Sequence, residues 1–317
     1  ASLILMVSFF LSAALGAVRQ VLFNAQFGVG PEASAYYAAF RLPDTLFSLI
    51  AGGALSSAMI PILLGAVQHE GPQAGARFVN LVLSFLLAVF ALIVLAGEMF
   101  APAFVGSLLA PGFDAPTQQL TVTLTRIMLA QPLILAVATV ATALLNSRNQ
   151  FFLTAISVVS HNVALIVGIL ATRVYPALGI YGPTLGVVLG AVLQVLILLP
   201  GLLQQGIRLQ PAWGLADRNL RALLRLLVPN GLSVSVNYAG FIVDTAFASR
   251  VQSEAALPAI FNAWLLVGLP IALLGQAVGQ GTFPRLAAHA AAGDWAAMRR
   301  TLVRALGVAV ALAVPAR

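Results

Sequence analysis

The sequence predicts an all-α integral membrane protein, a polytopic helical bundle of two pseudo-symmetric six-helix lobes around a central cleft. Hydrophobic residues make up 61% of the 317 positions and charged residues only 8%, whereas a soluble domain carries about 25% charged residues. The apolar residues form long runs that lack the alternating pattern of a membrane β-barrel. One short motif near the N-terminus also recurs near the C-terminus, which predicts the two lobes.

A hydrocarbon core about 30 Å thick requires roughly 20 apolar residues per helix. The apolar runs, divided at their Gly, Pro and charged breaks, predict spans at residues 3–27, 34–64, 76–108, 117–146, 151–175, 179–204, 228–250, 256–286 and 297–317. The chain begins and ends inside apolar runs, without the features of a cleavable signal peptide. We therefore expect these residues to be part of a longer protein.

The basic residues, all of them arginine, are distributed unequally between the two sets of turns. The turns after the even-numbered spans contain Arg77, Arg148, Arg208, Arg218, Arg221, Arg225, Arg285, Arg299, Arg300 and Arg304. The turns after the odd-numbered spans contain only Arg173 and Arg250. Because cytoplasmic connections are enriched in Lys and Arg, we predict that the N-terminus is cytoplasmic. This topology explains the net charge of +7 without a nucleic-acid partner.

The predicted domains are an N-terminal lobe at 1–204, a linker helix at 205–227 and the start of a second lobe at 228–317. In the linker, Asp217 is placed to cap a helix with leucines on one face and arginines on the other. This pattern favours a helix lying in the cytoplasmic membrane interface. The alternative is an ordinary solvated connector.

The repeated motif is ALSSAMIP at 54–61 and AVGQGTFP at 277–284, each downstream of a Leu-Pro pair. The first two spans therefore correspond to the seventh and eighth. A period of six spans keeps both copies in the same membrane direction, as in a parallel repeat of a transporter. Two such lobes would enclose a cleft gated by alternating access. Taken alone, either octet has a simpler interpretation as small-residue helix packing.

Small residues and prolines around these octets are candidates for close helix contact, for lining the cleft and for bending. Gly52 and Gly53 permit close approach or leave a cavity open, and Ser56 adds a polar group beside them. Prolines interrupt the helical hydrogen-bond ladder and permit bending. The candidate hinge prolines are Pro43, Pro61, Pro270 and Pro284.

Ionisable residues at membrane depth are costly and are functional candidates by default. Arg19 is the best candidate for contacting an anionic substrate, because a guanidinium matches phosphate oxygens bidentately; the alternative is snorkelling toward the interface. Arg41 and Asp44 have i, i+3 spacing and can neutralise each other, which favours a structural pair. Arg126 is expected to snorkel or to pair across helices.

In the seventh span, Asp244 lies two helical turns after Asn237, on nearly the same face. Asp244 is a candidate to ligate a cation, to carry a proton or to bond an arginine. The chain contains no P-loop, HExxH or GxSxG motif and no cysteine. We therefore expect a protein that is not an enzyme and needs no cofactor or structural metal, with sodium or a proton as a candidate coupling ion.

Five motifs together resemble the MurJ/MviN family. They are LGAVRQVLFNAQFGVGPEASAYYAAFRLPDTLFSLIAGGALSSAMIPIL (15–63), LAPGF (109–113), ALLNSRNQF (143–151), SVSVNYAGFIVDTAFAS (233–249) and GQGTFP (279–284). The family comprises lipid II flippases of the multidrug/oligosaccharidyl-lipid/polysaccharide exporter superfamily. The resemblance implies outward transport of an undecaprenyl-pyrophosphate-linked peptidoglycan precursor across the bacterial cytoplasmic (inner) membrane.

By this resemblance Arg19 and Arg41 match basic positions of the family, and Asp244 matches a position that binds sodium in some members. Together with the candidates from the residues themselves, the predicted substrate-binding set is Arg19, Arg41, Asp44, Ser56 and Asn237. Several charged family positions are uncharged here, at Ala13, Gln20, Ser34, Phe47, Gly52, Trp264, Leu265 and Gly268.

These charge losses leave alternatives to a divergent flippase. One is a transport-inactive relative that acts as a membrane scaffold with other cell-envelope proteins. Another is a small-solute exporter of the same superfamily. Each would share the predicted fold, and each would be embedded among membrane lipids.

Overall fold

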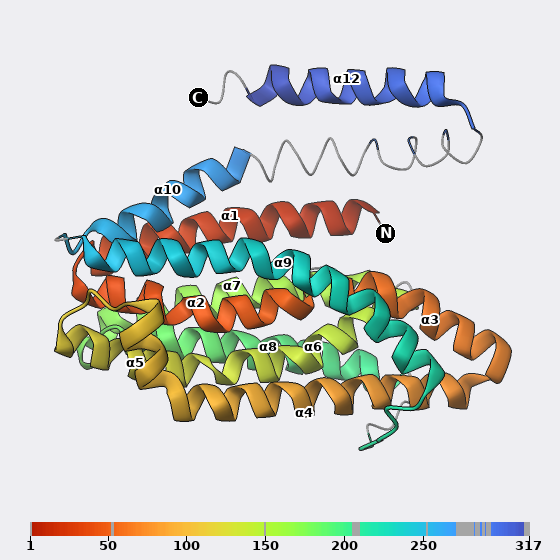
Figure 1. Cartoon of the computed structure of the whole chain (residues 1–317), viewed down its shortest axis with the longest axis horizontal. Helices are drawn as coiled ribbons and strands as arrows, with labels where there is room; N and C mark the ends of the chain where they lie inside the picture. Colours follow the sequence, from red (N-terminus) through yellow and green to blue (C-terminus); the bar gives the residue numbers. More distant parts are fainter. Residues whose placement is uncertain are drawn as a thin grey trace. The chain divides into compact units, whose positions relative to one another are not determined.

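The computed structural model describes residues 2–51, 54–148, 150–204, 210–251, 253–270 and 293–313, together with Thr282, Leu286 and His289, and every regular element in them is helical. The α-helices are α1 (Ser2–Phe27), α2 (Pro31–Ala51), α3 (Ala54–Glu70), α4 (Pro72–Phe104), α5 (Ala115–Met128), α6 (Ala130–Ser147), α7 (Phe151–Val174), α8 (Tyr181–Gln204), α9 (Arg218–Arg250), α10 (Ala256–Pro270) and α12 (Trp295–Ala313) (Figure 1). A π-helical turn, η1 (Val105–Leu109), follows α4, and a 3-10 turn, η2 (Pro176–Leu178), precedes α8.

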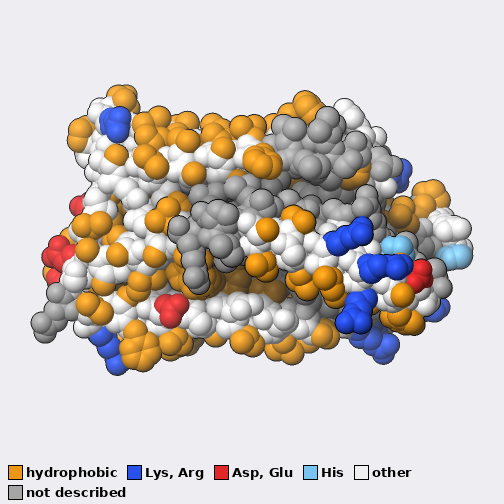
Figure 2. Space-filling model, turned by 90° about the horizontal axis from the view of Figure 1, so that it is seen from above, with side chains coloured by type: hydrophobic (Ala, Val, Ile, Leu, Met, Phe, Trp, Pro, Cys, Tyr) orange, Lys and Arg blue, Asp and Glu red, His pale blue; other side chains and the backbone are white. Residues whose placement is uncertain are grey.

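The prediction of a helical membrane protein is confirmed. Within the described residues, five helical stretches are long and apolar enough to cross a membrane: Pro72–Leu109, Ala115–Ser147, Phe151–Val174, Tyr181–Gln204 and Arg218–Arg250. The predicted number of spans stays a prediction. Figure 2 shows hydrophobic side chains spread over the visible face, as a lipid-facing surface allows.

Helix boundaries within two of the predicted spans differ from the expectation or lie outside the described residues. The span expected at 34–64 consists of α2 and α3, and Gly52 and Gly53 between them lie outside the described residues. The span expected at 117–146 consists of α5 and α6, which meet at Leu129. Uninterrupted hydrophobicity therefore predicted the membrane segment but not its division into helices.

The prolines proposed as hinges have different positions. Pro43 and Pro61 lie inside α2 and α3, and Pro270 is the last residue of α10. Pro284 lies outside the described residues. Their role in bending stays a prediction.

The chain forms two compact units, residues 1–258 and 259–317. In the first unit, a core of buried apolar side chains from α3, α4, α6 and α8 extends to the beginning of α9. Around it α7 packs extensively on α8, α1 packs on α7, and α2 contacts both α5 and α9 (Figure 1). The predicted lobe boundaries and the six-span repeat stay predictions.

The predicted cap at Asp217 is confirmed, and the helix that it begins is longer than the predicted linker segment. The Asp217 carboxylate accepts hydrogen bonds from the backbone N–H groups of Asn219 (2.9 Å) and Leu220 (3.1 Å), which caps α9. The helix then runs without a break to Arg250. At its beginning, Leu220 and Leu223 are buried in the apolar core of the first unit. Arg218, Arg221 and Arg225 remain exposed, and so do Leu226 and Val228 further along the helix.

Glycines permit the close contact between α7 and α8. A Cβ atom on Gly168 would lie 2.5 Å from the backbone oxygen of Gly182, and one on Gly182 would lie 2.3 Å from the Thr172 Cγ2 atom. Gly186 and Gly190 also face α7 backbone or side-chain atoms within 3.1 Å of such an added carbon. Small residues at helix interfaces allow this backbone approach in membrane proteins.

We predict that Gly168→Ala lowers the free energy of unfolding by about 1–3 kcal/mol, because the new methyl group clashes with rigid backbone. Thermal unfolding of the purified protein in detergent measures this as a lower Tm. Gly240→Ala is the matched control, since a Cβ at that helical position meets nothing within 4 Å. Equal Tm values for the two variants would contradict the packing argument.

Candidate functional site

Arg41 is the centre of the candidate site because it is a cation buried between two helices. Its side chain comes from α2 and is only 7% exposed. Its Nε atom donates a hydrogen bond to Thr245 Oγ1 on α9 at 3.1 Å. The guanidinium carbon lies 4.9 Å from the ring centroid of Phe241, also on α9. A guanidinium at this distance from an aromatic face is attracted by the ring quadrupole.

Two carboxylates act on this guanidinium. Asp44 on α2 and Asp244 on α9 both interact electrostatically with Arg41, and Arg19 on α1 interacts with Asp44. The structure therefore brings four of the ionisable residues predicted from the sequence into one electrostatic group. Opposite charges in such a group lower the cost of holding each ion away from water.

Arg19 lies at the contact between α1 and α7. Its Nη1 atom is 3.5 Å from Asn162 Oδ1, the acceptor of a long hydrogen bond. The Asn162 Nδ2 group in turn donates to Ser12 Oγ at 3.0 Å. Arg19 is half-buried, and this contact to another helix favours an interior role over snorkelling.

The positions of Asn237, Asp244 and Ser56 complete the set of predicted site residues. Asn237 and Asp244 are exposed on α9, so Asp244 is reachable from outside the first unit's core. Ser56 is in α3, and its side chain lies outside the described part of the structure. No group of three or more His, Cys, Asp or Glu side chains that could hold a metal ion occurs among the described residues.

Sequence reasoning missed Thr245, Phe241 and Asn162. Thr245 is fully buried and directly follows Asp244 in the sequence, but a neutral hydroxyl gave no signal in a search for charges. Phe241 was indistinguishable from the other aromatic residues of the apolar runs. Thr245 and Phe241 contact Arg41 because α9 packs against α2, and Asn162 contacts Arg19 because α7 packs against α1. A single sequence does not reveal which helices pack together.

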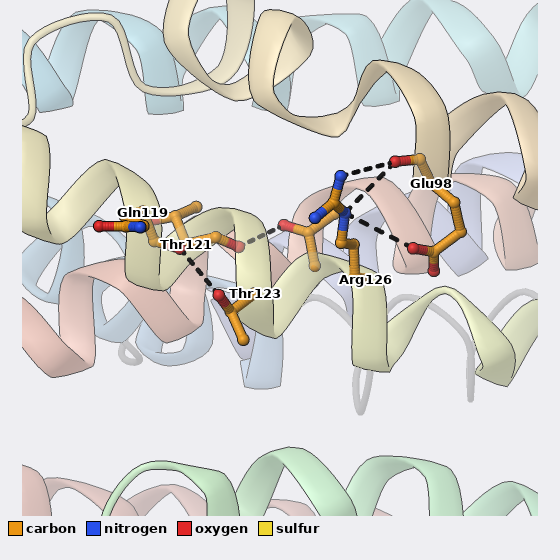
Figure 3. Close-up of polar contacts among 6 residues, drawn as sticks. Glu98, Gln119, Thr121, Thr123 and Arg126 are labelled. Carbon is orange, nitrogen blue, oxygen red and sulfur yellow. Dashed lines mark hydrogen bonds and ion pairs between the residues drawn. The ribbon is translucent and has the colours of Figure 1, made fainter.

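Arg126 pairs across helices, as one of the two expectations for it proposed. It donates from Nε and Nη2 to the backbone oxygen of Glu98, at 3.3 and 3.0 Å, and its Nε lies 3.6 Å from Glu98 Oε2 (Figure 3). The two side chains are 44% and 39% exposed. The pair joins α5 to α4 and lies outside the group around Arg41.

Comparison with known proteins identifies relatives over nearly the whole chain. The family described as "Lipid II flippase MurJ" matches residues 23–317. The lipid II flippase MurJ of Burkholderia cenocepacia is 34% identical over 283 residues, which cover 87% of this chain and 54% of that protein. A probable lipid II flippase MurJ of Rhizobium meliloti is 32% identical over 279 residues, or 86% of this chain and 51% of that protein. The chain thus spans about half the length of these curated relatives.

Solved structures show the same fold. A lipid II flippase MurJ in an inward closed conformation matches with a TM-score of 0.77 and 23% identity, covering 99% of this chain and 64% of that one. An inward-facing multidrug resistance MATE family transporter of the MOP superfamily matches with a TM-score of 0.75 and 15% identity, covering 96% of this chain and 68% of that one. At these identities the likeness establishes the fold alone.

The Glu98–Arg126 pair provides a test that is independent of family. We predict a coupling energy of about 0.2–1 kcal/mol in a double-mutant cycle of Glu98→Gln and Arg126→Gln, because both side chains are substantially exposed. Unfolding of the four proteins in detergent measures it. The backbone oxygen of Glu98 remains an acceptor in Glu98→Gln, so this comparison isolates the carboxylate. A coupling above about 2 kcal/mol would instead indicate a pair shielded from solvent.

Proposed function

Because the chain belongs to the MurJ family of lipid II flippases, we propose that the complete protein moves lipid II, a lipid-linked peptidoglycan precursor, from the inner to the outer leaflet of the bacterial cytoplasmic membrane. The observation that carries the proposal, beside the family match, is a buried arginine held between α2 and α9. A membrane protein retains a charge at such a position mainly for function.

The proposed chemistry is recognition of a diphosphate by guanidinium groups. Arg41 and Arg19 would bind the phosphate oxygens, since a guanidinium offers a planar set of donors that suits them. Asp44 would keep Arg41 oriented when the substrate is absent. Ser56 and Asn237 are proposed as additional polar contacts along the path.

Transport would follow alternating access between two lobes. We place the N-terminus in the cytoplasm because of the arginine distribution. Asp244 is the proposed site for a coupling sodium ion or proton, since it is a carboxylate exposed beside the Arg41 group. No other cofactor is proposed.

The family match favours transport over the alternatives of a membrane scaffold for envelope proteins or an exporter of small solutes. The uncharged residues at Ala13 and Phe47, where the family carries charge, are the observation that keeps the scaffold as a second candidate. Transport by the purified protein separates the two, because a scaffold would show none.

We predict that Arg41→Ala weakens substrate binding about tenfold or more, because a hydrogen bond to a charged group contributes about 1.5–3 kcal/mol. The rate of lipid II flipping by the complete protein in proteoliposomes, at limiting lipid II, measures the weaker binding as slower transport. Complementation of cells depleted of their own flippase is a second readout. Arg19→Ala is expected to act in the same direction.

Arg126→Ala is the control, since it removes an arginine that is paired away from the site. It should leave flipping near the parent's rate. The proposed function fails if the well-folded parent neither flips lipid II nor complements. The assigned site fails if Arg41→Ala and Arg126→Ala behave alike.

A further inference from the structure

Polar contacts join α2 to α9 and to the turn that follows it at three levels. Ser34 Oγ donates to the backbone oxygen of Glu254 at 2.7 Å. Arg41 Nε donates to Thr245 Oγ1 at 3.1 Å. Further along, the side chains of Ser48 and Tyr238 interact. We call these three contacts together the α2–α9 seam.

The seam has a regular geometry. Its α2 residues, at 34, 41 and 48, are each seven positions apart, and residues two helical turns apart share a face. Their partners occur in descending order along the chain, at 254, 245 and 238, so the two helices are antiparallel. One face of α2 is therefore paired with α9 over about 20 Å, at 1.5 Å per residue.

A neighbouring contact fixes the end of α9 to the rest of the first unit. The Gly112 backbone N–H donates to Ser249 Oγ at 3.1 Å. A Cβ atom at Gly112 would lie 2.3 Å from the backbone oxygen of Ser249, so only glycine permits this approach. A specific contact outside α2 thus holds this end of α9 in place.

The central level differs chemically from the other two. Ser34 and Ser48 make neutral contacts, whereas Arg41 contributes a charge that Thr245 and Phe241 hold in place and that Asp44 and Asp244 offset. A phosphate oxygen is a stronger partner for a guanidinium than a threonine hydroxyl is, because the bond is charge-assisted from both sides. A diphosphate that reaches Arg41 would therefore compete with Thr245.

We infer that Thr245 and Phe241 are positioning residues that hold the α2–α9 seam closed through Arg41, and that a substrate diphosphate opens the seam by taking Arg41 from them. This inference rests on the proposed function. A ligand shifts a conformational equilibrium only through its differential affinity for the two states. Here the difference is that Arg41 bonds to Thr245 in the closed state and to a phosphate oxygen of the substrate in the open state.

These 317 residues contain no cysteine, and any cysteine elsewhere in the complete protein is replaced by serine for the test. Ala248 on α9 is 4% exposed and lies one turn from Thr245, so Ala248→Cys in the complete protein reports opening through its labelling rate with a water-soluble maleimide. Two substitutions are compared in this background. Thr245→Val removes the hydroxyl at nearly constant volume, and Thr245→Ser retains it.

We expect Thr245→Val to raise the labelling rate about tenfold, the effect of one lost hydrogen bond to a charged group. Thr245→Ser should label at the parent's rate. Undecaprenyl diphosphate in proteoliposomes should accelerate labelling of the parent, and undecaprenol should not. Phe241→Leu, which removes only the aromatic face, should also accelerate labelling, and it serves as a second variant if Thr245→Val folds poorly.

The inference is overturned if well-folded Thr245→Val and Phe241→Leu both label at the parent's rate. It is also overturned if undecaprenyl diphosphate leaves labelling of a transport-active parent unchanged. These outcomes differ from a failure of the proposed function, in which the parent does not flip lipid II at all while the substitutions still change labelling.

Discussion

The burial of the Arg41 guanidinium is the constraint on which the account depends. An ion removed from water requires partners that offset its desolvation, and losing them costs several kcal/mol. Arg41 obtains them from both sides of one helix contact: Asp44 on its own helix, and Thr245, Phe241 and Asp244 on α9. The arrangement of α2 and α9 is therefore coupled to whatever anion Arg41 binds.

This coupling needs a rigid support on one side. The glycine contact between α7 and α8, and the apolar core beneath α3, α4 and α6, provide it within the first unit. Close-packed interiors shift between discrete arrangements more readily than they deform continuously. The α2–α9 contact, which is held by a few polar interactions, is the place where we expect movement.

Sequence reasoning predicted the membrane fold, because length and hydrophobicity of the runs are sufficient for it. It also selected Arg41, Asp44, Asp244 and Arg19 as residues of interest, since charge within an apolar run is a local signal. The cap at Asp217 was predictable for the same reason.

What the sequence did not reveal depends on tertiary contact. The bond from Arg41 to Thr245 joins positions about two hundred residues apart, and nothing local to either residue indicates it. The continuity of α9 was also missed, because charged residues at its beginning resemble a connector until its leucines are covered by the core.

The most direct test of the central idea is a distance between α2 and α9. Glu32 on α2 and Arg250 on α9 are both exposed, and these 317 residues contain no cysteine. Glu32→Cys and Arg250→Cys can therefore carry spin labels once any cysteine elsewhere in the complete protein is replaced by serine. Pulsed electron–electron double resonance should show one short distance between the two labels without substrate. Saturating lipid II should add a second, longer distance. A single distribution that is unchanged by lipid II would contradict the account.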